Sequence, residues 1–280
     1  MSLRRTNPSG GSTLRTINLT QDQPFRRHNP FGGTQPLPEE QPRLLEDITT
    51  VLKSVQSTIS VWSARVALVS CAAALVLLAS LHVLSPEFDP AVRMISEYAN
   101  GAYGAVLSLM FVLWAISSLA VAAAIAKDSN GNGGRIGLAL LVISGIGEAM
   151  GGLFDINHPL HDLAGFLGVL TMPAAAMLIS LALSRKPEWQ SAKAALLWSA
   201  NLTWISLLLF VVAMVVLIIG YTQAGNRLTP DVIALAGYAN RLFVIAYCAW
   251  TLLVAWQHLH ITSRPDARAA TLSTQELAQA

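Results

Sequence analysis

The stretch GIGEAMGGLFDINHPLHDLAGF, residues 145–166, joins the end of one long apolar run to the start of the next. It holds Glu148 inside the apolar part and, within the following residues, a group of four polar side chains: Asp155, His158, His161 and Asp162. Ionisable residues are otherwise scarce, because charged residues make up 12% of the 280 positions and hydrophobic residues 53%. A soluble domain has about 25% charged residues. The stretch therefore marks a candidate polar site in an otherwise apolar protein.

Six apolar runs, including the two joined by this stretch, are long enough to cross a membrane. Each is close to the roughly 20 residues that span a hydrocarbon core about 30 Å thick. The runs are continuous and do not alternate, which favours helices over a transmembrane barrel. We therefore predict an all-α integral membrane bundle of six transmembrane helices at residues 64–84, 102–126, 135–154, 162–184, 194–220 and 235–257.

The segments outside these runs differ in composition. Residues 1–41 are polar and lack an apolar run, which predicts a disordered tail. Five Arg residues within it, and Arg43 just after it, make this tail basic. Residues 42–61 carry apolar side chains at steps of three and four, which predicts an amphipathic juxtamembrane helix. An extension of the first spanning helix is the alternative. Residues 62–260 then form the membrane domain, and 261–280 form a polar tail.

The distribution of Lys and Arg predicts the orientation. Fifteen of the 18 Lys and Arg residues fall on the side of the membrane that holds both termini, whereas Arg93, Arg227 and Arg241 fall on the other. Cytoplasmic segments carry the excess of positive charge. We therefore expect a multi-pass protein of the cell membrane with both termini in the cytoplasm, and the 155–161 segment on the outer face.

Glu148 is the residue that most needs an explanation. It lies seven residues before Asp155, so it is about 10 Å deeper along a helix that rises 1.5 Å per residue. An isolated carboxylate in lipid costs several kcal/mol, so it should face the bundle and be paired or protonated. We expect Arg241, near the outer end of the last spanning run, to pair with it. The functional interpretation is a substrate, ion or proton site, and the structural one is a helix-locking pair.

Four residues of metal-ligand type fall near the same outer face: His82, Asp155, His158 and His161. A zinc or other divalent site needs three or four such ligands that converge. Pro159 lies between two of the histidines, so a regular helix does not fix their geometry. A divalent metal such as zinc is therefore one hypothesis among others, and no cofactor is assigned. Asp162 also has a structural explanation as the cap of the fourth spanning helix, where a carboxylate accepts from free N–H groups.

The candidate pocket combines these residues with polar ones from the loop before the second run and from the start of the last run. Its expected members are Ser96, Glu97, Glu148, Asp155, His158, His161, Asp162 and Arg241. Glycines at 147 and 151, with 165 and 168 on the next run, predict close packing of the third and fourth helices. The net charge of +2 is too small to indicate a nucleic-acid partner, and the lipid bilayer is the partner that the composition implies.

Several short motifs at these positions resemble a family of prokaryotic multi-pass membrane proteins catalogued as domain of unknown function 998. They are ISEY at 95–98, the segment 145–155, HDLAGF at 161–166, and Asn240-Arg241. The resemblance covers about residues 62–260 and leaves both tails outside. That family carries no assigned reaction, so the resemblance implies a bacterial multi-helix membrane fold without a particular chemistry.

Three classes of function stay open. The first is a binding protein whose outer-face pocket takes a small molecule, an ion or a lipid headgroup. The second is a membrane-embedded metal-dependent hydrolase, since Ser96, Asp155 and His161 are similar in type to the zinc-site residues of alkaline ceramidase-like enzymes. The last spanning run, however, lacks the His-x-x-x-His pair of those hydrolases. The third is a proton-linked transporter that uses Glu148. The sequence assigns no oligomeric state.

Overall fold

The computed structural model describes residues 40–91, 93–223 and 230–263. The predicted tails lie almost entirely outside these ranges. The chain divides into two units, Met1–Asp47 and Ile48–Ala280, and all six candidate membrane spans lie within the second.

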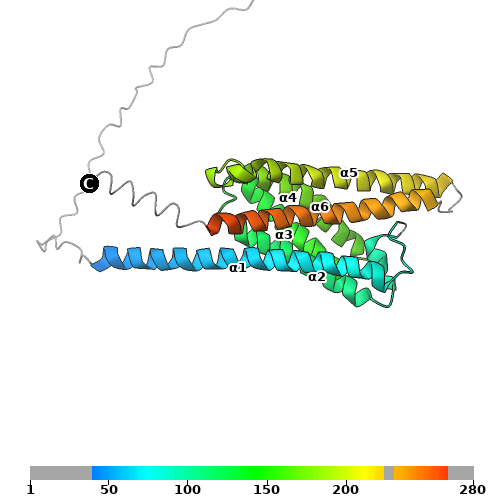
Figure 1. Ribbon diagram of the computed structural model, residues 1–280, viewed down its shortest axis with the longest axis horizontal. Coiled ribbons are helices and arrows are strands. Elements are labelled where there is room, and N and C mark those ends of the chain that lie inside the picture. The colour runs from blue at the N-terminus through cyan, green and yellow to red at the C-terminus, as the bar shows by residue number, and fades with distance from the viewer. Residues whose placement is uncertain (1–39, 92, 224–229, 264–280) are drawn as a thin grey trace, which may run out of the picture. The chain divides into compact units, whose positions relative to one another are not determined.

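The described residues form six long helices and no strand, so the predicted six-helix membrane fold is confirmed (Figure 1). The helices are α1 (Glu40–Leu84), α2 (Gly104–Ile125), α3 (Asn132–Leu153), α4 (His161–Leu183), α5 (Lys193–Gln223) and α6 (Pro230–Thr262). Two short 3₁₀ helices, η1 (Ile95–Asn100) and η2 (Pro187–Ala192), precede α2 and α5. Each of the six long helices contains a stretch that is apolar and long enough to cross a membrane. We call the two ends of this bundle the η1 end and the η2 end.

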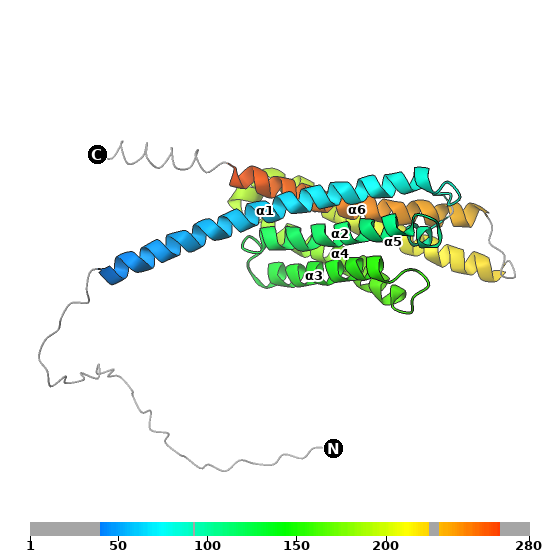
Figure 2. The ribbon, with the colours of Figure 1, turned by 90° about the horizontal axis from the view of Figure 1, so that it is seen from below.

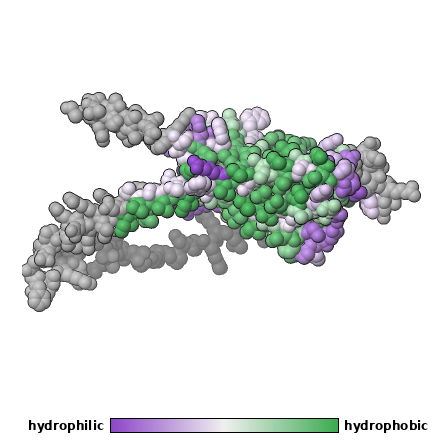
Figure 3. Space-filling view, turned by 60° about the horizontal axis from the view of Figure 1, so that its bottom comes forward, coloured by the Kyte–Doolittle hydropathy of each residue, from purple (hydrophilic) through white to green (hydrophobic). Residues whose placement is uncertain are grey.

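α1 is one continuous helix that includes both the amphipathic segment and the first span. Residues 43–84 contain neither Gly nor Pro, so nothing in this sequence interrupts the helix. From Ile48 to Trp62 an exposed apolar stripe recurs at steps of three and four, visible as a green band along this helix in Figure 3: Ile48, Val51, Leu52, Val55, Ile59 and Trp62. The stripe continues directly into the membrane-spanning part of the helix.

The other five helices form a ring. α2 contacts α3, α3 contacts α4, α4 contacts α5, α5 contacts α6, and α6 returns to α2. α1 packs outside this ring, beside α2 and α6 (Figure 2). The surface over the middle of the bundle is hydrophobic, and hydrophilic residues gather towards its two ends (Figure 3). This distribution is the one that a bilayer requires.

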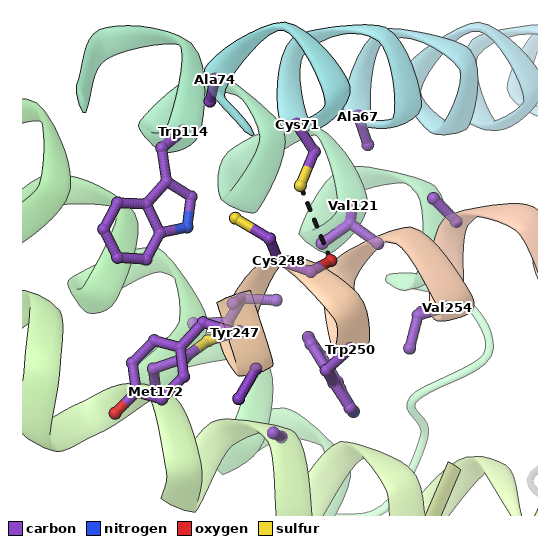
Figure 4. Packing of buried hydrophobic residues seen from close by; sticks show 14 of the residues in the cluster. Ala67, Cys71, Ala74, Trp114, Val121, Met172, Tyr247, Cys248, Trp250 and Val254 are labelled. Atoms are coloured by element: carbon purple, nitrogen blue, oxygen red, sulfur yellow. Dashed lines mark hydrogen bonds between the residues drawn. The ribbon is translucent and has the colours of Figure 1, made fainter. Parts of the chain in front are cut away.

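Small side chains on α1 make its contact with the ring. Ala64, Ala67, Cys71 and Ala74 are buried at steps of three and four. Figure 4 shows Cys71 pointing at α6, where its thiol donates to the backbone carbonyl of Cys248 over 3.6 Å. Both cysteines are free and buried. Small residues allow membrane helices to approach closely, because dispersion contacts rather than water exclusion hold such helices together.

α3 and α4 approach closely at Gly147 and Gly168. A Cβ atom built on Gly147 would lie 2.3 Å from the backbone nitrogen of Gly168, so only glycine fits there. The expected close packing of these helices is present, but the other two glycines do not contribute to it. Gly151 faces Phe111 of α2, and a Cβ on Gly165 would meet nothing within 4 Å. The close approach places Glu148, the next residue, against α4.

Pro173 lies inside α4 and has no N–H to donate to Val169, four residues earlier. The carbonyl of Val169 instead accepts from the hydroxyl of Tyr247, at 2.6 Å. A side chain of α6 therefore satisfies the backbone group that Pro173 leaves free. Such compensation by a neighbouring helix is how membrane helices tolerate proline.

Candidate functional site: a cavity inside the helix ring

A cavity of about 480 Å³ lies within the ring, towards the η1 end, and every helix of the ring contributes to its wall. Its wall includes one carboxylate from α3, two polar residues from the start of α4, and aromatic residues from α2, α5 and α6. These are Glu148, His161, Asp162, Phe111, Trp114, Phe210 and Phe243. Ligand pockets usually have volumes of about 300–1,000 Å³ and combine an apolar wall with a few polar groups.

Glu148 is buried in this wall, with 3% of its surface exposed. Ser118 of α2 donates to Oε2 over 2.7 Å, and Ser144, one turn earlier on α3, lies 3.2 Å from Oε1. Two neutral hydroxyls thus contact the carboxyl group, and no Lys or Arg among the described residues forms an ion pair with it. The group therefore has hydrogen-bonding partners but lacks a counter-charge.

Ser144 lies within reach of two acceptors. Its hydroxyl is 2.9 Å from the carbonyl of Gly168 and 3.2 Å from Oε1 of Glu148, yet it has one proton to donate. When that proton goes to Gly168, Oε1 of Glu148 can carry a proton and donate it to Ser144. When the proton goes to Glu148, the carboxylate is the acceptor. Ser144 and the carbonyl of Gly168 therefore accommodate Glu148 in both of its protonation states.

The expected pair of Glu148 with Arg241 is wrong. The Arg241 guanidinium is 8% exposed and donates to four other groups: His82 Nε2 at 2.9 Å, Arg93 O at 2.7 Å, Gly237 O at 3.0 Å and Tyr98 Oη at 3.2 Å. These groups lie in the α1–α2 connection, at the end of α1 and on α6. Arg241 thus holds the η1 segment and α1 against α6, and it does not line the cavity.

The predicted pocket residues separate into two groups. Ser96, Glu148, His161 and Asp162 line the cavity. Glu97 does not line it: this residue binds Arg93 at 2.8 Å and accepts from the amide of Met94. Asp155 accepts from the amide of Asn157, and the ring of His158 stacks on Phe154 with centroids 4.5 Å apart. Both belong to the α3–α4 loop and not to the cavity wall.

The four candidate metal ligands do not converge. Among the described residues, no three His, Cys, Asp or Glu side chains form a group that could hold a metal. His82 instead accepts from Arg241, and its Nδ1 faces the carbonyl of Leu78 at 2.6 Å. His161 Nδ1 faces the carbonyl of Phe154 at 3.0 Å. The ring nitrogens of His82 thus contact Arg241 and a carbonyl, and the predicted metal hypothesis finds no converging set of ligands in this part of the chain.

Asp162 does not cap α4, contrary to expectation. The N-cap residue is Leu160, whose side chain makes no capping bond, and Asp162 lies in the first turn. A carboxylate there still interacts favourably with the positive end of the helix dipole. Its side chain is exposed and belongs to the cavity wall.

Comparison with known proteins assigns the chain to a family. A family model described as "Protein of unknown function (DUF998)" matches residues 67–257. The chain belongs to the DUF998 family. The match covers α2, α3, α4 and α5 completely, and with them the whole cavity wall. No curated protein and no solved structure matches the chain.

Within the DUF998 match, the serines that contact Glu148 and the aromatic residues of the cavity wall were not predicted from the sequence. Ser144 could have been found, because a position four residues before a buried acid lies on the same helix face. Ser118, Trp114 and Phe243 could not, because they come from other helices and only the packing brings them to Glu148.

A second polar cluster lies at the η2 end. Asp128, in the α2–α3 connection, contacts Lys186 and His258 at 3.3 Å each, and the His258 ring is 2.6 Å from the hydroxyl of Ser60 on α1. Burial would raise the pKa of Asp128, but the contact with His258 and the charge of Lys186 outweigh it, so this pKa lies below its usual value. The cluster connects α1, α6 and two connecting segments. Ser60 and His258 both lie just outside the DUF998 match.

Proposed function

We propose that this DUF998 protein binds a small amphiphilic molecule inside its helix ring, with Glu148 as the polar anchor. The observation that carries the proposal is the position of this buried carboxylate in the wall of a 480 Å³ cavity that is otherwise mainly apolar. A buried ionisable group in a membrane protein is costly, and it marks a ligand, ion or proton pathway when it faces an internal cavity. A group kept only for packing would not need that cavity.

A proton-linked carrier is the second candidate function. The observation that favours it is the alternative donation of Ser144, which suits Glu148 both with and without a proton. The metal-dependent hydrolase has no comparable support in the described residues, because no three His, Cys, Asp or Glu side chains among them converge.

The proposal includes an orientation, with the η1 end of the bundle outside the cell membrane and both termini in the cytoplasm. The excess of Lys and Arg on the other side supports it. We expect Asn157→Cys, in a chain that lacks Cys71 and Cys248, to react with an impermeant thiol reagent in intact cells. Asn130→Cys, in the α2–α3 connection, should react only after permeabilisation. The opposite pattern would place the cavity at the cytoplasmic face.

The binding function is tested with a neutral photoreactive amphiphile, a dodecanol that carries a diazirine, added to the purified protein in lipid nanodiscs. We expect peptides that contain Phe210 and Phe243 to be labelled. Gly165→Leu should reduce this labelling several-fold. Gly165 lines the cavity, and the new side chain would fill the open space beside it.

Gly133→Leu is the matched control, since Gly133 also has nothing within 4 Å of its Cβ position but lies at the start of α3, at the η2 end. This variant should label like the wild type. Labelling that is confined to lipid-facing peptides, or that Gly165→Leu leaves unchanged, would contradict binding inside the ring.

A further inference from the structure

The charges in the cavity wall are of one sign. Two carboxylates, Glu148 and Asp162, belong to the wall, and none of its described residues is Lys or Arg. Two arginines at the same end have other partners, because Arg241 donates to His82 and Tyr98, and Arg93 binds Glu97. A pocket whose wall contains two carboxylates and neither Lys nor Arg favours a positively charged guest and disfavours an anion.

Aromatic side chains line the same space. Phe111 and Trp114 of α2 stack with centroids 6.1 Å apart, and Phe210 of α5 meets Phe243 of α6 at 4.9 Å. The negative face of an aromatic ring attracts an ammonium group within about 6 Å, and the attraction grows when the cation is desolvated. The rings can also pack against an alkyl or aryl body. Both parts of a lipophilic amine would therefore find contacts.

Glu148 lacks the partner that such an amine supplies. The neutral hydroxyls of Ser118 and Ser144 contact its two carboxyl oxygens. Hydrogen bonds from neutral donors offset part of the cost of burying a carboxylate, whereas a counter-ion offsets the charge itself. A carboxyl oxygen can accept more than one hydrogen bond, so the serines do not exclude a further donor.

We infer that the ligand is an organic cation, an ammonium group attached to an apolar body, with the ammonium beside Glu148 and the body against the aromatic rings. This inference rests on the proposed function and specifies the chemistry of the guest. The positive charge of the guest and a proton on Glu148 exclude one another, since protonation removes the negative charge that holds the ammonium. Binding should therefore weaken as the pH falls.

Other titratable groups face the same region. Tyr247 and Cys248 of α6 interact electrostatically with Glu148, and His161 and Asp162 of α4 belong to the cavity wall. The hydroxyl of Tyr247 donates a hydrogen bond to the backbone carbonyl of Val169, and neutral Tyr and Cys side chains add no positive charge. Variants at Glu148 and Asp162 separate the two acids. Glu148→Gln should remove most of the pH dependence of binding, and Asp162→Asn should remove only a small part.

The test uses three photoreactive probes with the same diazirine dodecyl chain and different head groups: trimethylammonium, hydroxyl and sulfate. In nanodiscs of uncharged lipid, the ammonium probe should label the Phe210 and Phe243 peptides about tenfold more than the hydroxyl probe, which corresponds to about 1.4 kcal/mol. The sulfate probe should label them least. In Glu148→Gln most of the ammonium preference should be lost, because the carboxamide keeps the shape but not the charge, and only the weaker contribution of Asp162 and the aromatic rings remains.

The outcomes are distinguishable. The hydroxyl probe reports whether Glu148→Gln still folds with an open cavity, since its labelling needs no charge. Cavity labelling by all three probes without an ammonium preference, or a preference that is undiminished in Glu148→Gln, would overturn the cationic guest beside Glu148 and leave the proposed function intact. Cavity labelling by none of the three would overturn both.

Discussion

Replacing Arg241 with alanine is expected to lower the free energy of unfolding by about 3–5 kcal/mol, comparable with the loss of one partner from a buried charged network. The change removes the donor for His82, for the carbonyl of Arg93 and for the hydroxyl of Tyr98. Buried acceptors that lose a donor cost roughly 1–3 kcal/mol each. The loss should be measured by reversible denaturant unfolding in a fixed detergent.

Two further variants define the cause. Arg241→Lys keeps the charge but not the planar set of donors, so it should lose an intermediate amount. Glu148→Gln, combined with Arg241→Ala, should recover nothing, because the two side chains have separate partners. A coupling above about 1 kcal/mol in this double-mutant cycle would show that they interact after all.

Gly147→Ala is expected to cost about 3 kcal/mol, at the upper end for overpacking, although it adds a single methyl group. The new Cβ would lie 2.3 Å from the nitrogen of Gly168 and 2.8 Å from the carbonyl of Ala164. Both are backbone atoms, so α3 and α4 must separate as whole helices. Unfolding in the same detergent system measures the loss.

Gly165→Ala is the control for this change, since it adds the same methyl group on the facing helix with nothing within 4 Å. It should be neutral or stabilise by up to about 1 kcal/mol, because alanine is the better helix former. Equal losses in the two variants would show that the close approach at Gly147 is not what holds the helices together.

The fold could be predicted because bilayer thickness imposes it on the sequence. Apolar runs near 20 residues allow a single interpretation, and the six predicted spans correspond to α1–α6. The length of α5, which reaches Gln223, and the start of α6 at Pro230 were predicted less well. Helix ends can extend beyond the hydrocarbon core, where hydropathy no longer restricts them.

The site could be predicted only in part. The scarcity of charge in the apolar runs drew attention to Glu148, and the glycines on the third and fourth runs predicted that α3 and α4 pack closely. The pairing with Arg241 failed because depth and sign of charge do not fix which face of a helix a side chain occupies. Arg241 lies one turn after Gly237 on α6, and it turns towards the α1–α2 connection rather than into the ring. The direction in which a side chain points from its helix depends on how the helices pack. A periodic pattern of mostly apolar residues does not encode that packing.

The bond between Tyr247 and Val169 has a mechanical consequence for the cavity. Val169 belongs to the cavity wall, and its carbonyl is held by a side chain of α6 instead of an amide of α4. Separating α4 from α6 at this level breaks one hydroxyl contact and leaves the ladder of amide bonds in each helix unchanged. At Val169 the cavity wall is therefore a boundary between two helices that one side-chain hydrogen bond links. Because Pro173 already lacks the backbone bond to Val169, α4 can bend there without breaking a further bond of its own.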